Sequence, residues 1–342
     1  MFKPTLTSSS RDLAHLTTRI SCLVLLATLQ TSCMASSHAT SDEKKEETSS
    51  MQPLSNAWFE LASTPGRVEF ETIESARWVV PREGLINLDH PRAREAGLED
   101  GDEAISIFMH VMHHPDRGDF VIDSGVARSF EPGGEEPPVA DFLKKRARLD
   151  KLEMLTSTAT WLASREEPVR GIFLTHAHLD HVLGVPDFPA ETALYAGPEE
   201  TTHREMMHMF TRGTTNRLLE GKPPLQTMQF EADPAGIVEG VKDVFGDGEV
   251  FALHVPGHTP GSVAFLVRTT QGPVLVTGDA AHTAWGWEHC VESGTFNKDG
   301  AGSARSLKQL KALEERLPNL KVLLGHQHLK GKRSTQNACT AG

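Results

Sequence analysis

The heptapeptide THAHLDH, residues 175–181, gathers side chains that bind metal ions or transfer protons. Three histidines and one aspartate stand within six residues, directly after the apolar run VRGIFL. Imidazoles and carboxylates are costly to bury without partners, so a cluster beside a buried strand needs compensation. Nitrogen and oxygen donors of this kind suit Zn²⁺, with iron and manganese as alternatives. The heptapeptide therefore predicts a metal site at the end of a strand.

Further donor residues stand in the same kind of position, after an apolar run and beside glycine. His258 lies in PGHTPGS after EVFALHV, Asp279 lies in TGDAAHT after GPVLV, and His326 lies in GHQH after LKVLL. Glycine lets the backbone approach a ligand closely. On an extended chain His176 and His178 project to the same side. Taken singly, each donor has the alternative of a solvated or hydrogen-bonded side chain; together they predict one metal-binding region.

The order HxHxDH, GHTPGS, GDA and a late GH, over about residues 65–330, resembles the metallo-β-lactamase-fold hydrolase superfamily. This resemblance implies an α/β fold, a four-layer αββα sandwich, with two divalent metal ions, most simply Zn²⁺, at one edge. It assigns His176, His178 and His258 to the first ion. It assigns Asp180, His181 and His326 to the second ion, and Asp279 to both ions. Asp123, in DFVIDSG, resembles the family's early Asp-Gly turn and is expected to support the site rather than to bind metal.

Two such ions, about 3.5–4 Å apart, can share a bridging water and lower its pKa from ~15.7 towards neutrality. The resulting hydroxide would attack an electrophilic carbonyl or phosphorus, so the chain is predicted to be a metal-dependent hydrolase. No side-chain nucleophile is needed, and the sequence contains no GxSxG motif. Asp180 is a candidate for proton transfer as well as for metal binding.

His282 is a second candidate catalytic residue. It follows Asp279 by three residues, where lactonase-like relatives often carry a tyrosine that contacts the substrate carbonyl. A histidine there would donate the same hydrogen bond or protonate the leaving alkoxide. The alternative is a histidine that touches only protein or solvent. His328 is expected to point away from the site, and His113 and His114 are expected in an exposed hairpin.

The branches of the superfamily differ in substrate. Zinc β-lactamases usually carry cysteine where this chain has Asp279, which argues against penicillin hydrolysis. Lactonase-like members, which open N-acyl homoserine lactones or related cyclic esters, match the ligand set and the GDAxH/Y arrangement. We therefore predict an ester or lactone hydrolase. The alternatives are a thioesterase of glyoxalase II type and a non-catalytic metal-binding lipoprotein on the same scaffold.

Amino-acid composition and net charge limit the class of substrate. The 342 residues, with 38% hydrophobic and 23% charged side chains, are typical of a globular protein. The formal net charge of −12 repels phosphate backbones, so a small-molecule substrate is expected rather than a nucleic acid. Nothing in the sequence indicates an oligomer interface.

The site must be positioned by strands from two halves of the chain. Each half runs from strands to helix, which predicts two sheets with helices outside them. Residues 138–166 carry Leu and Met at helical spacing and predict one or two helices. The expected strands are residues 67–73, 76–81, 104–112, 119–125, 169–175, 192–197, 249–256, 262–269, 272–279 and 320–326, with a late helix over 303–317.

The N-terminus predicts export. Three basic residues precede the apolar run Ile20–Leu29, which is shorter than the ~20 residues that span a bilayer but suits a signal-peptide core. Residues 1–33 are expected to be a signal peptide of lipoprotein type with Cys33 as the lipidated residue, and cleavage after Ala35 with plain secretion is the alternative. The location is then the periplasm, a membrane tether or the exterior.

The remaining boundaries follow from composition. Residues 34–52 are polar and predicted to be a disordered linker, residues 53–330 the hydrolase domain, and residues 331–342 a loose tail. Cys290 and Cys339 would remain as thiols able to form one disulfide in an oxidising compartment, although the sequence does not fix their proximity.

Overall fold

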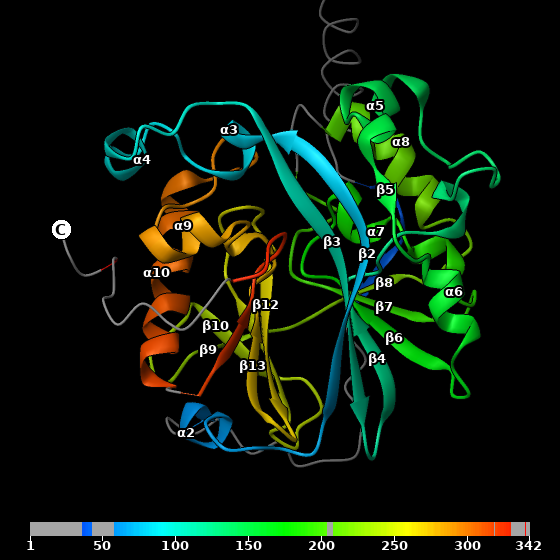
Figure 1. Cartoon of the computed structure of the whole chain (residues 1–342). Helices are drawn as coiled ribbons and strands as arrows, with labels where there is room; N and C mark the ends of the chain where they lie inside the picture. The colour runs from blue at the N-terminus through cyan, green and yellow to red at the C-terminus, as the bar shows by residue number, and fades with distance from the viewer. Residues whose placement is uncertain (1–35, 43–57, 204–207, 318, 330–338, 340–342) are drawn as a thin grey trace, which may run out of the picture.

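Two β-sheets face each other, and helices cover the outer face of each (Figure 1). This computed structural model describes residues 36–42, 58–203, 208–317, 319–329 and 339. The four layers are the predicted αββα sandwich.

The first sheet has eight strands in the order β1-β8-β7-β6-β4-β3-β2-β5. The strands are β1 (Thr40–Asp42), β2 (Glu69–Pro81), β3 (Asp102–His114), β4 (Gly118–Ile122), β5 (Glu153–Met154), β6 (Val169–Phe173), β7 (Ala193–Ala196) and β8 (Leu225–Thr227). Strands β4, β6, β7 and β8 run parallel, so their carboxyl ends meet at one edge. Strand β2 is one continuous strand where two were predicted, at residues 67–73 and 76–81. A bulge between Glu74 and Ala76 lies at the gap between the two predictions.

The second sheet has six strands in the order β14-β13-β12-β11-β10-β9. They are β9 (Glu231–Ala232), β10 (Gly240–Asp243), β11 (Val250–His254), β12 (Val263–Thr269), β13 (Gly272–Val276) and β14 (Lys321–Leu323). Neighbours are antiparallel except β13 and β14, which are parallel. As a result β11, β13 and β14 all end at the same edge of this sheet.

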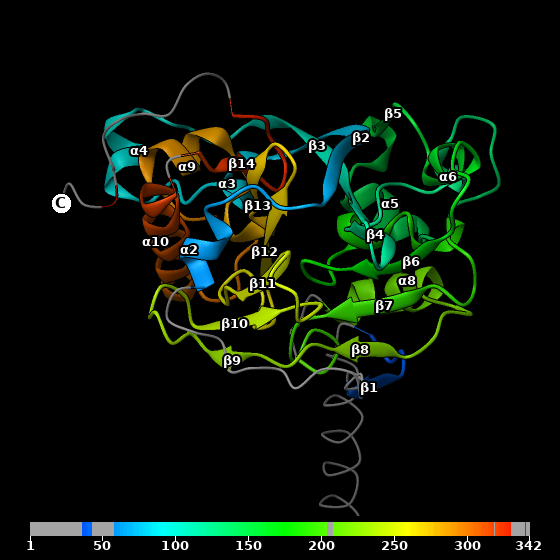
Figure 2. The same cartoon turned by 90° about the horizontal axis from the view of Figure 1, so that it is seen from below.

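The helices lie outside the sheets, as Figure 2 shows from below. They are α2 (Trp58–Ala62), α3 (Arg82–Leu85), α4 (Pro91–Glu95), α5 (Asp141–Arg146), α6 (Thr158–Ala163), α7 (Leu179–Val182), α8 (His208–Leu218), α9 (Ala284–His289) and α10 (Gly300–Arg316). The helical pattern of residues 138–166 becomes the two short helices α5 and α6. Arg148, at φ 56°, takes a left-handed conformation that ends helical geometry between them.

The core forms three layers between these four. Alternate residues of β12 face opposite ways: Val263, Phe265 and Val267 point between the sheets, whereas Ala264 and Leu266 point towards α10. Phe265 meets Phe173 of the first sheet with ring centroids 5.8 Å apart. This contact joins the two strands that lead to HxHxDH and away from GHTPGS.

Residues 36–42 correct the prediction of a disordered linker. Strand β1 pairs in parallel with β8, and the buried hydroxyl of Ser36 donates to Asn216 Oδ1 at 2.7 Å. A polar strand can satisfy the unpaired backbone at a sheet edge without burying apolar side chains, and composition does not register this. Residues 1–35 and 43–57, with the predicted signal peptide and the rest of the linker, lie outside the described residues.

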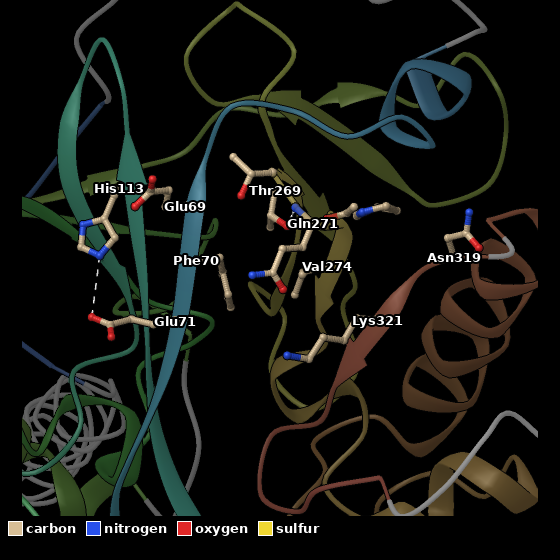
Figure 3. Close-up of a pocket in the computed structure, with 12 residues that line it drawn as sticks. Glu69, Phe70, Glu71, His113, Thr269, Gln271, Val274, Asn319 and Lys321 are labelled. Carbon is tan, nitrogen blue, oxygen red and sulfur yellow. Dashed lines mark hydrogen bonds and ion pairs between the residues drawn. The ribbon is translucent and has the colours of Figure 1, made fainter.

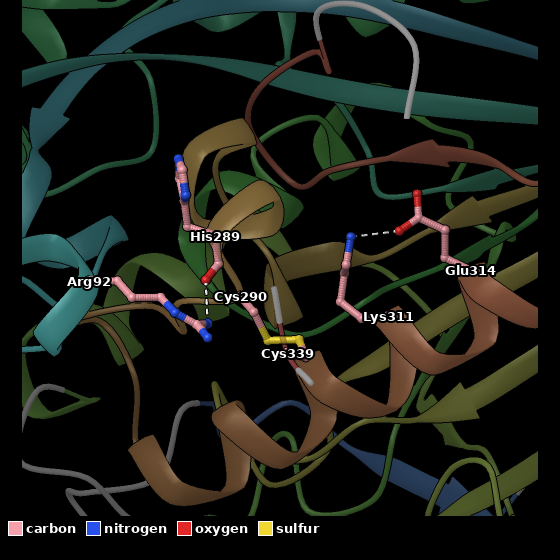
Figure 4. Close-up of a disulfide and its surroundings, with 6 residues drawn as sticks. All are labelled: Arg92, His289, Cys290, Lys311, Glu314 and Cys339. Carbon is pink, nitrogen blue, oxygen red and sulfur yellow. Dashed lines mark hydrogen bonds and ion pairs between the residues drawn. A yellow bond between two sulfur atoms is a disulfide. The ribbon is translucent and has the colours of Figure 1, made fainter. Parts of the chain in front are cut away.

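A disulfide joins Cys290, at the end of α9, to Cys339 (Figure 4). The predicted loose tail is therefore attached to the domain at Cys339, while residues 330–338 and 340–342 lie outside the described part. Among the described residues, no helix has the length and apolar character to cross a membrane.

Candidate metal centre

Strands β6, β11, β13 and β14 all end at the upper edge of the sandwich in Figure 1. The loop and short helix α7 after β6, the turn after β11, the 3₁₀ turn Gly278–Ala280 after β13 and the loop after β14 meet there. The structure thereby brings together all the predicted metal ligands, namely His176, His178, Asp180, His181, His258, Asp279 and His326.

The first group of donors consists of His176, His178 and His258, whose ligand atoms lie within 4.8 Å of one another. His258 Nε2 is 3.1 Å from His176 Nε2 and 2.8 Å from His178 Nδ1. Burial lowers the pKa of His176 and of His258 well below the usual value. Both imidazoles are therefore neutral, and each has a lone pair that a cation can share.

The second group consists of Asp180, His181, Asp279 and His326. His326 Nε2 lies 3.3 Å from Asp180 Oδ2 and 3.2 Å from Asp279 Oδ1. Burial lowers the pKa of His326, but the two carboxylates, Asp279 above all, outweigh it and raise that pKa to about 10. The carboxylates thus attract positive charge strongly at this position.

Asp279 touches both groups. Its Oδ2 lies 3.3 Å from His258 Nε2 in the first group and 3.4 Å from His181 Nε2 in the second. Burial disfavours its ionisation, but the surrounding histidines hold the pKa of Asp279 well below its usual range. The carboxylate therefore lies within reach of histidines from both groups.

Several buried polar atoms of the cluster have no hydrogen-bond partner within the part of the chain that the structure describes. These are His181 Nε2, Asp279 Oδ1 and His282 Nε2. Every ion pair formed there by Asp279 is with a histidine rather than with lysine or arginine. A buried carboxylate without a fixed cation is costly, and a divalent ion would satisfy the carboxylate and the orphaned nitrogens together. The residues fit a metal centre.

The Nδ1 atoms of His181 and His326 are held by hydrogen bonds on the side away from the cluster. His181 Nδ1 donates to Asp123 Oδ2 at 2.7 Å, and His326 Nδ1 donates to the carbonyl oxygen of Ser106 at 3.0 Å. Metal-binding histidines almost always donate their second ring N–H in this way, which fixes the tautomer. Asp123 also accepts from Thr175 N at 2.8 Å. It lies behind the ligands, in the supporting position that the sequence predicted.

Residues 103–326 match the family model of the metallo-beta-lactamase superfamily, and the ligand cluster lies inside that range. The chain belongs to this superfamily. Membership confirms the predicted family and fold. Together with the lactonase relatives described next, it identifies the chain as a metal-dependent hydrolase.

Similar proteins within the metallo-β-lactamase superfamily indicate which branch of it this chain resembles. The N-acyl homoserine lactonase AttM of Azorhizobium caulinodans is 30% identical over 233 residues, 66% of this chain and 83% of the relative. AttM of Agrobacterium fabrum is 28% identical over 228 residues with the same coverage. A solved N-acyl homoserine lactone hydrolase with N-hexanoyl-L-homoserine at its catalytic metal centre shares the fold, with a TM-score of 0.54 and 19% identity, over 77% of this chain and 94% of that one.

The two loops that carry the first group are joined by Glu200, a residue that sequence reasoning missed. Its Oε2 accepts from Ala177 N at 2.7 Å, and Thr259 Oγ1 donates to its Oε1. Burial raises the pKa of Glu200 to about 7. Gly261 of the GHTPGS motif passes so close that an added Cβ would lie 2.1 Å from the carbonyl oxygen of Pro198. Nothing in the sequence around Glu200 signals this role, because both contacts depend on distant loops.

His282 lies inside the cluster. Its Nε2 is 3.0 Å from Asp279 Oδ2, and its ring stacks on that of His326 with centroids 5.5 Å apart. The side chain is buried, so the alternative of a plain surface histidine is wrong.

The remaining histidines lie elsewhere. His328 is 59% exposed and lies 3.9 Å from Glu74, away from the cluster as expected. The hairpin at residues 113–118 exists, but the prediction that His113 and His114 are exposed is wrong. His114 is buried against Phe245 with Nε2 3.0 Å from Asp247, and His113 is half-buried with Nδ1 2.8 Å from Asp119. Acidic partners from other loops let these two rings face inward.

Proposed function

We propose that this chain hydrolyses lactones of the N-acyl homoserine lactone type at a centre of two divalent ions, most simply Zn²⁺. The observation that carries the proposal is the position of Asp279 between two separate groups of nitrogen and oxygen donors. The AttM relatives, which are named N-acyl homoserine lactonases, support the substrate class.

We propose that the donors divide between the ions as the family resemblance implies. His176, His178 and His258 would hold the first ion, Asp180, His181 and His326 the second, and Asp279 both. Bound ions would acidify a water molecule and polarise the carbonyl of the ester. The chain itself supplies the orientation of the ligands and the exclusion of bulk water, because most of these side chains are buried.

Asp180 is the carboxylate that a substrate can reach. Its side chain is 19% exposed, compared with 3% for Asp279. The contact with His326 holds its Oδ2 at the mouth of the second group. We therefore assign proton transfer to Asp180, in addition to metal binding.

The test is proton release on mixing the metal-loaded protein with an N-acyl homoserine lactone. His178→Ala removes one ligand of the first group, and His328→Ala is the matched control because that ring is exposed and outside the cluster. We expect fast release by the wild type and the control and loss of release by His178→Ala. Bound metal without release would exclude lactones, and a parallel thioester assay would then detect a glyoxalase II-like activity.

We also propose that the protein is exported. The basic and apolar N-terminal residues support this, and the Cys290–Cys339 disulfide suits an oxidising compartment. Cys33→Ser should move the protein from the membrane fraction to the soluble fraction if Cys33 is lipidated. Unchanged fractionation would favour cleavage after Ala35 and plain secretion.

A further inference from the structure

His282 has a position and a hydrogen-bonding pattern that match those of the ligand histidines. We propose that it binds metal through Nε2, as an additional ligand beside Asp279, rather than contacting the substrate. The seven ligand positions implied by the family resemblance do not include it. This inference rests on the proposed metal centre but not on the identity of the substrate.

The first support is position. The ligand atoms of His258, Asp279 and His282 all lie within 4.8 Å of one another and form a third possible metal-binding group. This group shares His258 with the first group and Asp279 with the second. The ring of His282 lies 4.9 Å from that of His258, centroid to centroid. His282 therefore faces the region between the two predicted ions.

The second support is the contact with Asp279. His282 Nε2 lies 3.0 Å from Asp279 Oδ2, yet it makes no hydrogen bond to any described residue. Two ligands that each lie ~2.0–2.1 Å from a zinc ion are separated by about 2.9–3.4 Å for angles between square and tetrahedral. The spacing of these two atoms thus fits two ligands of a shared ion. His114 Nε2 also lies 3.0 Å from a carboxylate without a hydrogen bond, so the tautomer is needed to distinguish the two rings.

The third support is the tautomer. His282 Nδ1 contacts Ser293 Oγ, and that hydroxyl lies 3.4 Å from the carbonyl oxygen of Asp279, to which it donates. We take Ser293 Oγ as the acceptor of the Nδ1–H proton, which places a lone pair of the ring on Nε2. His181 with Asp123, and His326 with the Ser106 carbonyl, show the same arrangement. A metal-binding histidine needs this second partner.

This tautomer separates the proposal from the role suggested by the tyrosine of lactonase-like relatives. A tyrosine hydroxyl can donate a hydrogen bond to a substrate carbonyl. A neutral His282 with its proton on Nδ1 has no donor facing the cluster. It can share an electron pair with a cation, but it cannot replace the tyrosine as a hydrogen-bond donor.

The experiment compares the full-length wild type with His282→Asn, Ser293→Ala and the control His328→Asn. Each protein is loaded with Co²⁺, its visible absorption spectrum is recorded, and its affinity for both ions is measured by competition with a chelator. Loss of a ligand changes the geometry around Co²⁺ and hence the spectrum. We expect His282→Asn to shift the spectrum and to weaken one ion by ~10-fold or more, and His328→Asn to match the wild type.

Ser293→Ala keeps the imidazole and removes only the acceptor of its Nδ1 proton, so a smaller change in the same direction is expected. If His282→Asn does not fold, Ser293→Ala decides: an unchanged spectrum and affinity would overturn the proposal. Wild-type spectrum and affinity in a folded His282→Asn protein with a reduced kcat would instead establish a substrate contact. Failure of the wild type to bind Co²⁺ or Zn²⁺ would reject the metal centre itself, which is a different result.

Discussion

Histidines and aspartates gather at both ends of the sandwich, but in the described residues the carboxylates of the donor cluster form ion pairs with histidines, whereas those beside the β3–β4 hairpin also pair with arginine. At the end formed by the β3–β4 hairpin, Arg67 Nη1 lies 2.7 Å from Asp116 and its Nε lies 3.1 Å from Glu249. At the other end, the ion pairs of Asp279 are all with histidines. The carboxylates at the hairpin end have arginine partners, whereas those of the donor cluster have only histidines, a setting that suits an added cation.

The histidines at the two ends also differ in which ring nitrogen carries the proton. His114, Asp116 and Asp247 are close enough together to hold a metal ion. However, His114 Nδ1 accepts from the backbone N–H of Asp116 at 3.2 Å, so the ring proton is on Nε2, which faces Asp247 at 3.0 Å. His181 and His326 are arranged in reverse, with Nδ1 donating and Nε2 facing the cluster. Proximity of donors is therefore not sufficient, and the hydrogen bonds behind each ring decide.

A cleft of about 420 Å³ lies at the end of the sandwich formed by the β3–β4 hairpin, between the start of β2 and the β12–β13 turn (Figure 3). Its lining includes Glu71 and His113, 3.7 Å apart, and the cation Lys321. Charges of both signs are thus present in the hollow. In this molecule the hollow and the cluster of metal-type donors are on opposite edges of the sheets.

The largest expected effect comes from removing the shared carboxylate. Asp279→Ala should lower the metal content below the proposed two ions and reduce hydrolysis to background, because both donor groups lose the carboxylate that lies within 3.5 Å of their histidines. The matched control at the other end is Asp247→Ala, since Arg67 and His114 are its partners there. Metal analysis and lactone turnover are the measurements. Two ions retained in Asp279→Ala, or metal lost in Asp247→Ala, would remove the distinction between the ends.

His110 lies in the middle of β3, and its environment differs from that of the histidines at both ends of the sandwich. It is buried between Phe70 and Phe108, with Thr72 Oγ1 3.0 Å from its Nδ1, and burial lowers its pKa to about 3. The folded protein keeps this ring neutral, whereas the unfolded chain takes up a proton below the ordinary pKa of about 6.5. The free energy of unfolding should therefore fall as the pH drops from about 6.5 to 3, by a few kcal/mol at most.

His110→Phe should flatten this pH dependence, even if the absolute stability changes through the lost Thr72 contact. Urea unfolding of the wild type and variant between pH 4 and 7 measures the two slopes, and His328→Phe is the control because that ring is exposed. Equal slopes in the wild type and His110→Phe would mean that His110 is accessible to protons in the folded state.

A substitution of Asp123 tests whether hydrogen bonds to the Nδ1 atoms of the cluster histidines affect metal affinity. Asp123→Asn keeps an acceptor for His181 Nδ1 and suits the left-handed backbone at φ 57°, but it removes the charge. We expect metal affinity to fall by ~10–100-fold with little change in fold. Asp119→Asn, in the His113 and Arg165 pairs at the other end, should leave affinity unchanged. Chelator competition distinguishes them, and equal affinities in both variants would contradict the argument.

The gathering of the donor residues was predictable from sequence, because the segments that carry them follow strands and strand ends meet at sheet edges. The supporting residues were not. Glu200 and Ser293 join loops that only the complete fold brings together. The strand β1 was missed because its stabilisation comes from backbone pairing at the edge of β8, which leaves no apolar pattern. Sequence thus predicted which donor residues lie together, whereas long-range contacts determine which ring nitrogen of His181 and His326 faces the cluster.

The smallest expected effect is that of Arg67→Gln. The arginine side chain is 52% exposed and Asp116 is 61% exposed, so solvent and salt screen most of their attraction. The buried Glu249 loses its contact with Arg67 Nε but keeps Arg268 and the backbone N–H of residue 67 as partners. We expect a slightly lower Tm at low salt, a difference from the wild type that shrinks as salt is added, and an unchanged content of bound metal. His114 still accepts the Asp116 N–H in this variant and offers no lone pair at Nε2. An extra ion bound by Arg67→Gln would show that arginine alone, and not the histidine tautomer, keeps metal from this end of the sandwich.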